Sequence, residues 1–164
     1  MLINFKVRLN REQIAKVIYG SILILVVVLA LEEEHFVGVK NSVLVLFTAF
    51  AIMLAELYSD VISSMIENKR NLSLEEWQQV VLNSGAVMVA AFLPALCFLL
   101  GGLAVIPHET SFQLAKWSAV LLLGLYGYLS TSLAGRSQAW RLTGAASAIL
   151  IGLIIVSVKF LLEI

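Results

Sequence analysis

The chain has 164 residues, of which 60 % are apolar and only 13 % are Asp, Glu, Lys or Arg. Soluble domains are about 45–50 % apolar and about 25 % charged, so this composition excludes most soluble enzymes and predicts an integral membrane protein. Eleven basic residues balance eleven acidic ones, and without a basic excess we expect no nucleic-acid partner. The only cysteine, Cys97, leaves no internal disulfide and no cysteine zinc site.

Five segments are long and apolar enough to cross about 30 Å of hydrocarbon, which takes roughly 20 residues of helix. They cover residues 14–31, 43–66, 80–106, 112–133 and 143–162. The polar breaks between them are too short to hold a soluble domain. The sequence therefore predicts an all-α membrane protein, a single transmembrane domain over residues 1–164 built as a bundle of five helices.

The first segment follows a basic start. Residues 2–13 fit either a short interfacial helix or a frayed basic tail. A basic start before an apolar stretch is also typical of a cleaved signal peptide, but the rest of the chain is itself membrane-spanning, so we expect a first span here. The run Glu32–Glu34 with His35 then fits a solvated loop, or alternatively a region that attracts cations.

The second segment carries a polar stripe, because Glu56, Asp60 and Glu67 recur at helical spacing. Glu56 lies about ten residues from the polar end of the segment, which is roughly 15 Å of helix. Carboxylates at such depth are rare and usually face a cavity or the bundle interior. We expect no Lys or Arg at a comparable depth in any span, so a bound cation or a proton must neutralise the acids.

This stripe leads to the hypothesis of a site for a divalent cation. Glu56 and Asp60 are its predicted primary ligands, and Glu56 also exchanges protons. Glu67 collects ions at the mouth, and Met53 and Tyr19 complete the site. The alternative is that Glu56 is a packing residue, hydrogen-bonded to a polar side chain of a neighbouring helix.

The polar break before the third segment contains Ser73-Leu74-Glu75-Glu76, which fits a capping box and predicts that the third helix starts near Leu74. Pro94 predicts a kink further along, because proline removes one backbone hydrogen bond. Asn83 and Ser84 lie at a depth similar to that of the acids. Together they make a polar pocket plausible at the end of the bundle where the chain begins.

In the last two segments, glycines and alanines at helical spacing indicate close helix packing. Orientation follows the distribution of Lys and Arg. With the N-terminus in the cytoplasm, Lys40, Lys116 and Lys159 fall outside, against eight basic residues on the inner side: Lys6, Arg8, Arg11, Lys16, Lys69, Arg70, Arg136 and Arg141. The bias predicts a multi-pass protein of the plasma membrane with a cytoplasmic N-terminus and an external C-terminus.

Motifs of catalysis are missing from the sequence, which has no G-x-S-x-G, no H-E-x-x-H and no Walker A loop. The histidines His35 and His108 are predicted on the side opposite to the acids, so a nucleophile and a base would not meet. We therefore expect no enzyme and no bound cofactor. A metal ion would be a substrate.

Several short motifs resemble the vacuolar iron transporter family. They are Ala55-Glu56-Leu57-Tyr58-Ser59 in the second segment, Ala91-Phe92-Leu93-Pro94-Ala95-Leu96 with Gly101-Gly102 in the third, and the glycine-rich stretch from Gly144 to Leu162. The chain is most similar to small uncharacterised bacterial five-span membrane proteins related to that family. The resemblance implies a homodimer that exports Fe²⁺ or Mn²⁺ from the cytosol against protons, with Glu56 at the position of the family's second-helix Glu.

The sequence departs from the family pattern at two places. The acid that the family has early in its first helix is replaced here by Tyr19-Gly20. The family's long Glu-rich cytoplasmic helices are reduced to a loop with Glu67, Glu75 and Glu76. With fewer carboxylates, metal capture is expected to be weaker. The competing interpretation is a membrane scaffold or regulatory protein that transports nothing.

Overall fold

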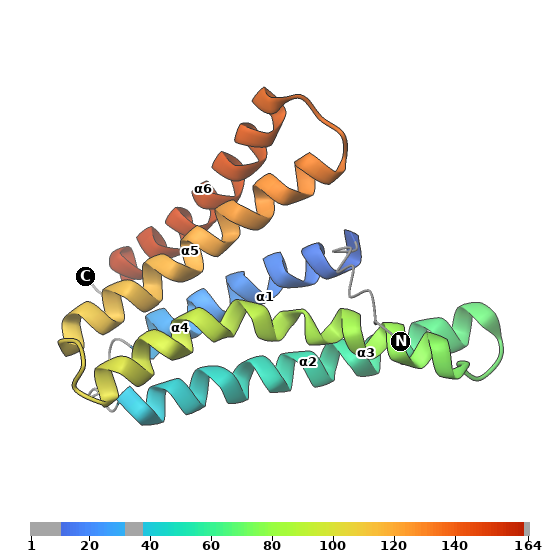
Figure 1. Cartoon of the computed structure of the whole chain (residues 1–164), viewed down its shortest axis with the longest axis horizontal. Coiled ribbons are helices and arrows are strands. Elements are labelled where there is room, and N and C mark those ends of the chain that lie inside the picture. The colour runs from blue at the N-terminus through green and yellow to red at the C-terminus, as the bar shows by residue number, and fades with distance from the viewer. Residues whose placement is uncertain (1–10, 32–37, 163–164) are drawn as a thin grey trace, which may run out of the picture.

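The computed structural model describes residues 11–31 and 38–162, and this part of the chain forms six helices (Figure 1). They are α1 (Arg11–Ala30), α2 (Gly38–Asn68), α3 (Leu74–Gly85), α4 (Val87–Gly102), α5 (His108–Leu133) and α6 (Gln138–Leu162). The all-helical class is confirmed over these residues. The run Glu32–Glu34 with His35, and residues 2–10 of the N-terminal stretch, lie outside the described residues.

Four helical segments of the described chain are long and apolar enough to cross a membrane: Arg11–Ala30, Gly38–Asn68, Leu74–Gly102 and Gln138–Leu161. The third of these combines α3 and α4. Large apolar side chains also cover the outside of the bundle, and Phe47, Phe92 and Leu121 are each about two-thirds exposed. Exposed apolar side chains in such number are typical of a surface that contacts lipid, and together with the four apolar helical segments they indicate a membrane protein.

The central helix is α1, which packs against α4 and α5 and more lightly against α2. Its Ile24 is fully buried, as is Phe98 of α4. Phe98 meets Phe112 of α5 edge to face, with ring centroids 5.0 Å apart. These contacts belong to the larger of two apolar clusters; the second joins α1, α5 and α6 through residues that include Leu25, Leu123 and Ala148.

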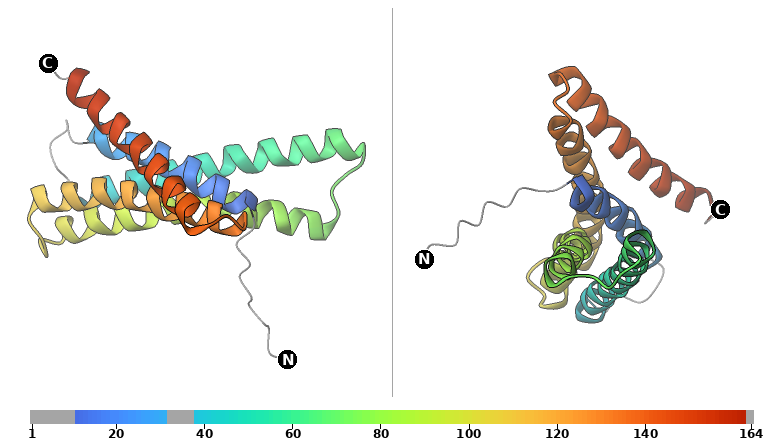
Figure 2. Two further views of the ribbon diagram at one scale, coloured as in Figure 1. Left: turned by 90° about the horizontal axis from the view of Figure 1, so that it is seen from above. Right: turned by 90° about the vertical axis from the view of Figure 1, so that its right-hand side faces the viewer.

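The last helix, α6, packs almost entirely on α5 and stands away from α2 and α4 (Figure 2). Small residues permit this close approach. A Cβ atom added to Gly127 would lie 2.5 Å from the backbone oxygen of Gly144, and one added to Gly144 would meet Thr131 at the same distance. The small residues predicted to pack helices therefore do so between α5 and α6.

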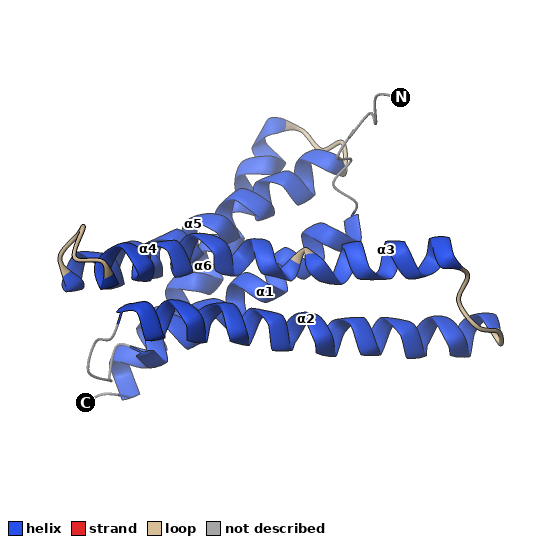
Figure 3. Ribbon diagram, turned by 60° about the horizontal axis from the view of Figure 1, so that its bottom comes forward, coloured by secondary structure: helices blue, strands red, loops and turns tan. Residues whose placement is uncertain are grey.

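At one end of the bundle, α2 and α3 run side by side and project as a hairpin beyond the start of α1 (Figure 3). The hairpin turns back at the predicted capping box. The Ser73 hydroxyl accepts a hydrogen bond from the Glu76 backbone N–H at 3.3 Å, and the Glu76 carboxylate accepts one from the Ser73 backbone N–H at 2.7 Å. The predicted helix start near Leu74 is confirmed.

The long third span is interrupted at Ala86, between α3 and α4. The interruption directly follows Gly85, and glycine has the lowest helix propensity after proline. Helix α4 continues through Pro94, which is fully buried. The prediction placed the irregularity at Pro94, whereas the helix is broken eight residues earlier.

Candidate functional site

The candidate site is built around Lys16 on the second turn of α1, whose side chain is only 9 % exposed. Glu12 stands one turn earlier on the same face of the helix, with its carboxylate 3.9 Å from the Lys16 ammonium. A buried ammonium is costly unless it is paired. The partners of Lys16 therefore decide what this site can do.

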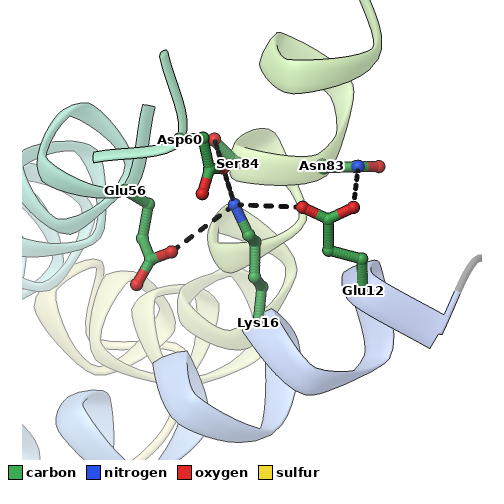
Figure 4. Close-up of polar contacts among 6 residues, drawn as sticks. All are labelled: Glu12, Lys16, Glu56, Asp60, Asn83 and Ser84. Carbon is green, nitrogen blue, oxygen red and sulfur yellow. Dashed lines mark hydrogen bonds and ion pairs between the residues drawn. The ribbon is translucent and has the colours of Figure 1, made fainter. Parts of the chain in front are cut away.

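Helix α2 supplies the main partners, because Glu56 and Asp60 are one turn apart and both face α1 (Figure 4). The Lys16 ammonium donates a hydrogen bond to Oδ2 of Asp60, its closest contact. It lies 3.4 Å from Oε2 of Glu56. The Glu56 and Asp60 side chains are 26 % and 24 % exposed, so both remain within reach of water.

Helix α3 completes the arrangement with two neutral side chains. The Ser84 hydroxyl, fully buried, donates to Asp60 at 3.2 Å and accepts from Lys16 at 3.4 Å. The Asn83 amide donates to Glu12 at 2.7 Å. We call Glu12, Lys16, Glu56, Asp60, Asn83 and Ser84 the charge cluster. It joins three helices, and its three carboxylates exceed its single ammonium by two formal negative charges.

Glu12, Asp60 and Asn83 of the charge cluster line a cavity of about 300 Å³, which we call the acidic cavity. The cavity has no basic residue in its lining, which consists of Glu12, Asp60, Ser63, Ser64, Glu67, Glu76, Gln79, Val80 and Asn83. Four carboxylates thus face one polar space, a distribution that concentrates cations.

One acid of the acidic cavity has a basic partner beside it. Arg70 donates two hydrogen bonds to Glu76, at 2.7 and 2.9 Å. Hydrogen bonding to this carboxylate, and its charge, raise the pKa of Arg70 further above its ordinary value. Glu12, Asp60 and Glu67 are the other three acids that line the cavity.

The expectation that no Lys or Arg reaches the depth of Glu56 and Asp60 is wrong, because Lys16 contacts both. The reason is the projecting hairpin. The sequence gives the depth of the two acids only relative to the end of α2. Helix α2 extends past the start of α1 (Figure 1). The contact with Lys16 therefore places Asp60 level with the second turn of α1. The two acids are therefore nearer the end of the bundle than the sequence indicated, and they have a positive partner.

Of the other predicted ligands, Glu67 lies beside the charge cluster, whereas Tyr19 and Met53 make no polar contact with it among the described residues. Glu67 lines the acidic cavity. Tyr19 is 47 % exposed. Among the described residues, no set of three or more His, Cys, Asp or Glu side chains is placed to hold a metal ion. Lys16 instead stands between the carboxylates.

The sequence analysis recognised Asn83 and Ser84 as polar groups of this region but missed Glu12 and Lys16. A signal was present: Glu12 and Lys16 have the i, i+4 spacing of a helical ion pair. Lys16 also falls inside the first apolar segment, where an unpaired charge is unfavourable. A lysine there predicts a carboxylate on a neighbouring helix.

Comparison of the chain with protein-family models, with curated proteins and with solved structures gives no match. What the charge cluster does is therefore argued from its own geometry.

Proposed function

We propose that this protein is a membrane transporter that binds a divalent cation, Fe²⁺ or Mn²⁺, at the charge cluster and exports it from the cytosol in exchange for protons. The observation that carries the proposal is the convergence of three carboxylates on one ammonium beside the acidic cavity, which Glu12 and Asp60 also line. Lys16 occupies the position that a cation would take between them. The two negative charges left over favour a further cation.

Lys16 acts in this proposal as a built-in counterion. A cation that enters the acidic cavity meets Asp60 first and then displaces the ammonium from Asp60 and Glu56. Carboxylate oxygens are suitable ligands for Mn²⁺ and similar ions, and the flexible four-carbon stem of lysine allows the ammonium to move aside. When the cation leaves, Lys16 or a proton neutralises the acids again.

The proposal includes a topology. Helix α5, one residue longer than α6 and richer in polar side chains, is the fifth span. The N-terminus is then cytoplasmic, the C-terminus external, and the membrane is the plasma membrane. A homodimer and a relationship to the vacuolar iron transporter family complete this proposal. Accessibility of terminal tags in intact cells tests the orientation, and native mass spectrometry tests the dimer.

The function is tested by flux of Mn²⁺ and Fe²⁺ into proteoliposomes with an imposed pH gradient. We expect transport by the wild-type protein and its loss in Glu56→Gln and Asp60→Asn. Glu109→Gln is the matched control, because it removes one exposed carboxylate at the opposite end of the bundle, and it should transport normally. Fluxes equal to those of protein-free vesicles would refute the proposal, as would normal flux in both cluster variants.

A second candidate function is a non-transporting membrane scaffold, and one observation favours it. Lys16 already supplies the counterion, and the hydrogen bonds of the charge cluster tie α1, α2 and α3 together. The two functions differ in how Mn²⁺ affects thermal unfolding. A ligand of the native state raises the midpoint, and Lys16→Met, which removes the competing ammonium, should enlarge that rise. A scaffold predicts no Mn²⁺ effect in either protein.

A further inference from the structure

A second cavity lies on the other side of the first turns of α1, between this helix and the end of α5. It has a volume of about 570 Å³, and its charged lining residues are Arg11 of α1 and Arg136 in the loop between α5 and α6. No carboxylate lines it. We call it the basic cavity. It is separate from the charge cluster, since the two linings share no residue.

Within residues 11–31 and 38–162, neither Arg11 nor Arg136 forms an ion pair. Two arginines that line one space with no acid make that space electropositive. An anion in the cavity would supply the missing counterion.

Local structure places Arg136 at this point. Helix α5 ends in a turn at Gly135, whose φ of +68° suits glycine, and the Arg136 backbone N–H donates to the Thr131 carbonyl at 3.3 Å. The Arg136 guanidinium lies 5.8 Å from the ring centre of Trp140, within the range of a cation–π contact. Trp140 is 60 % exposed, and exposed tryptophans at the ends of membrane helices are typical of the headgroup level.

We propose that the basic cavity binds a phosphate-bearing anion, with an anionic lipid headgroup as its source. The planar fork of arginine matches the oxygens of phosphate and binds them with two parallel hydrogen bonds. The volume is within the range of pockets for small ligands, about 300–1,000 Å³. Leu133, half-exposed on the cavity wall, offers apolar surface for the adjoining acyl chain, which a free phosphate ion would not use.

The test is a titration of the purified full chain in detergent, followed by native mass spectrometry, with phosphatidylglycerol and phosphatidylcholine as probes. We expect phosphatidylglycerol to bind at least about tenfold more tightly. Arg11→Gln and Arg136→Gln should each weaken it about tenfold, because each removes a charge-assisted contact. Arg136→Lys, which keeps the charge without the fork, should fall between. Lys40→Gln, an exposed charge at the opposite end, should bind as the wild type does.

A second arm separates the lipid from a soluble source by titrating inorganic phosphate into the same proteins by calorimetry. Binding of phosphate that depends on Arg11 and Arg136 supports the anion site and makes a free phosphate its ligand. Equal binding of the two lipids with no phosphate binding would overturn the proposal. So would wild-type affinity in both arginine variants.

Discussion

The first turns of α1 separate two cavities of opposite charge at the same end of the bundle. Glu12 lies in the wall of the acidic cavity, towards α2 and α3, and Arg11 lies in the wall of the basic cavity, towards the end of α5. The two residues are neighbours in sequence, but successive helical residues point about 100° apart. One turn of helix thus presents opposite charges to two different spaces.

The two cavities differ in how their charges are neutralised. The acids beside the acidic cavity have a counterion within the fold, because Lys16 of the charge cluster bonds to Asp60 and lies close to Glu56. The basic cavity has none among the described residues. Charges paired within the fold contribute to folding, whereas charges left unpaired are free to bind something else. Removal of one charge should therefore lower the free energy of unfolding more at the charge cluster than at the basic cavity.

The largest expected effect comes from Lys16→Met. Removal of one partner of a buried ion pair leaves uncompensated charge, at a cost of about 3–5 kcal/mol. Because the acids are about one-quarter exposed, we expect a smaller loss of about 2–4 kcal/mol in the free energy of unfolding. Denaturant unfolding in mixed micelles, followed by circular dichroism, measures it.

The matched control for Lys16→Met is the double variant Lys16→Met/Asp60→Asn. It removes the acid that the lysine neutralises, so most of the lost stability should return, as a double-mutant cycle detects for residues in contact. If the single variant is as stable as the wild type, Lys16 is not a structural counterion. The contrast between the two cavities would then fail.

The next largest loss of stability is expected where α5 packs closely on α6, next to the basic cavity. Gly127→Ala places a Cβ atom 2.5 Å from the backbone oxygen of Gly144 and 2.7 Å from Ala148, so α6 must move away from α5. We expect a loss of about 1–3 kcal/mol, as for other overpacked sites, by the same unfolding measurement. Gly85→Ala meets no atom within 4 Å and should be neutral or slightly stabilising.

The variant Gly127→Ala should affect the basic cavity but not the acidic cavity. Gly127→Ala should weaken anion binding as well as stability, because α5 leads directly into the loop that carries Arg136. It should leave the response to Mn²⁺ unchanged. Equal losses at both cavities would mean that α5 and α6 support the whole end of the bundle and not one side of it.

The sequence was sufficient to predict the apolar helices, the capping box at Ser73, and the position of Glu56 and Asp60 on one face of α2. These features depend on local rules of length, spacing and capping that do not need the tertiary arrangement. Asn83 and Ser84 were also placed in the right region, because they fall in the same half of a neighbouring span.

Lys16 could not be paired with the acids from span boundaries alone. Boundaries give the length of each helix but not the offset between helices, and the projection of α2 and α3 beyond α1 sets that offset. The basic cavity was missed for a related reason. Arg11 and Arg136 are 125 positions apart, and only the tertiary packing of α1 on α5 brings them to one space.

A smaller effect is expected at the hairpin that forms the outer wall of the acidic cavity. Ser73→Ala removes the N-cap hydroxyl of α3, and loss of such a cap typically costs about 1 kcal/mol. Ser73→Asn restores a capping side chain and should keep the stability of the wild type. Hydrogen exchange of the first turn of α3 reports the change locally, and unaltered exchange rates in Ser73→Ala would contradict the role of the capping box.

The smallest effect is expected from Arg136→Gln, and it completes the comparison. Because the guanidinium group is exposed and has no ion-pair partner among the described residues, its removal should change the free energy of unfolding by about 0.5 kcal/mol or less. The lost cation–π contact with Trp140 and the lower positive charge beside Arg11 act in opposite directions, so the net change should be small. In the presence of phosphatidylglycerol, the wild type should gain a thermal midpoint increase that Arg136→Gln lacks, because only a ligand of the native state stabilises it. A large loss of stability without lipid would show that Arg136 has a structural partner, as Lys16 does, and the two cavities would then be alike.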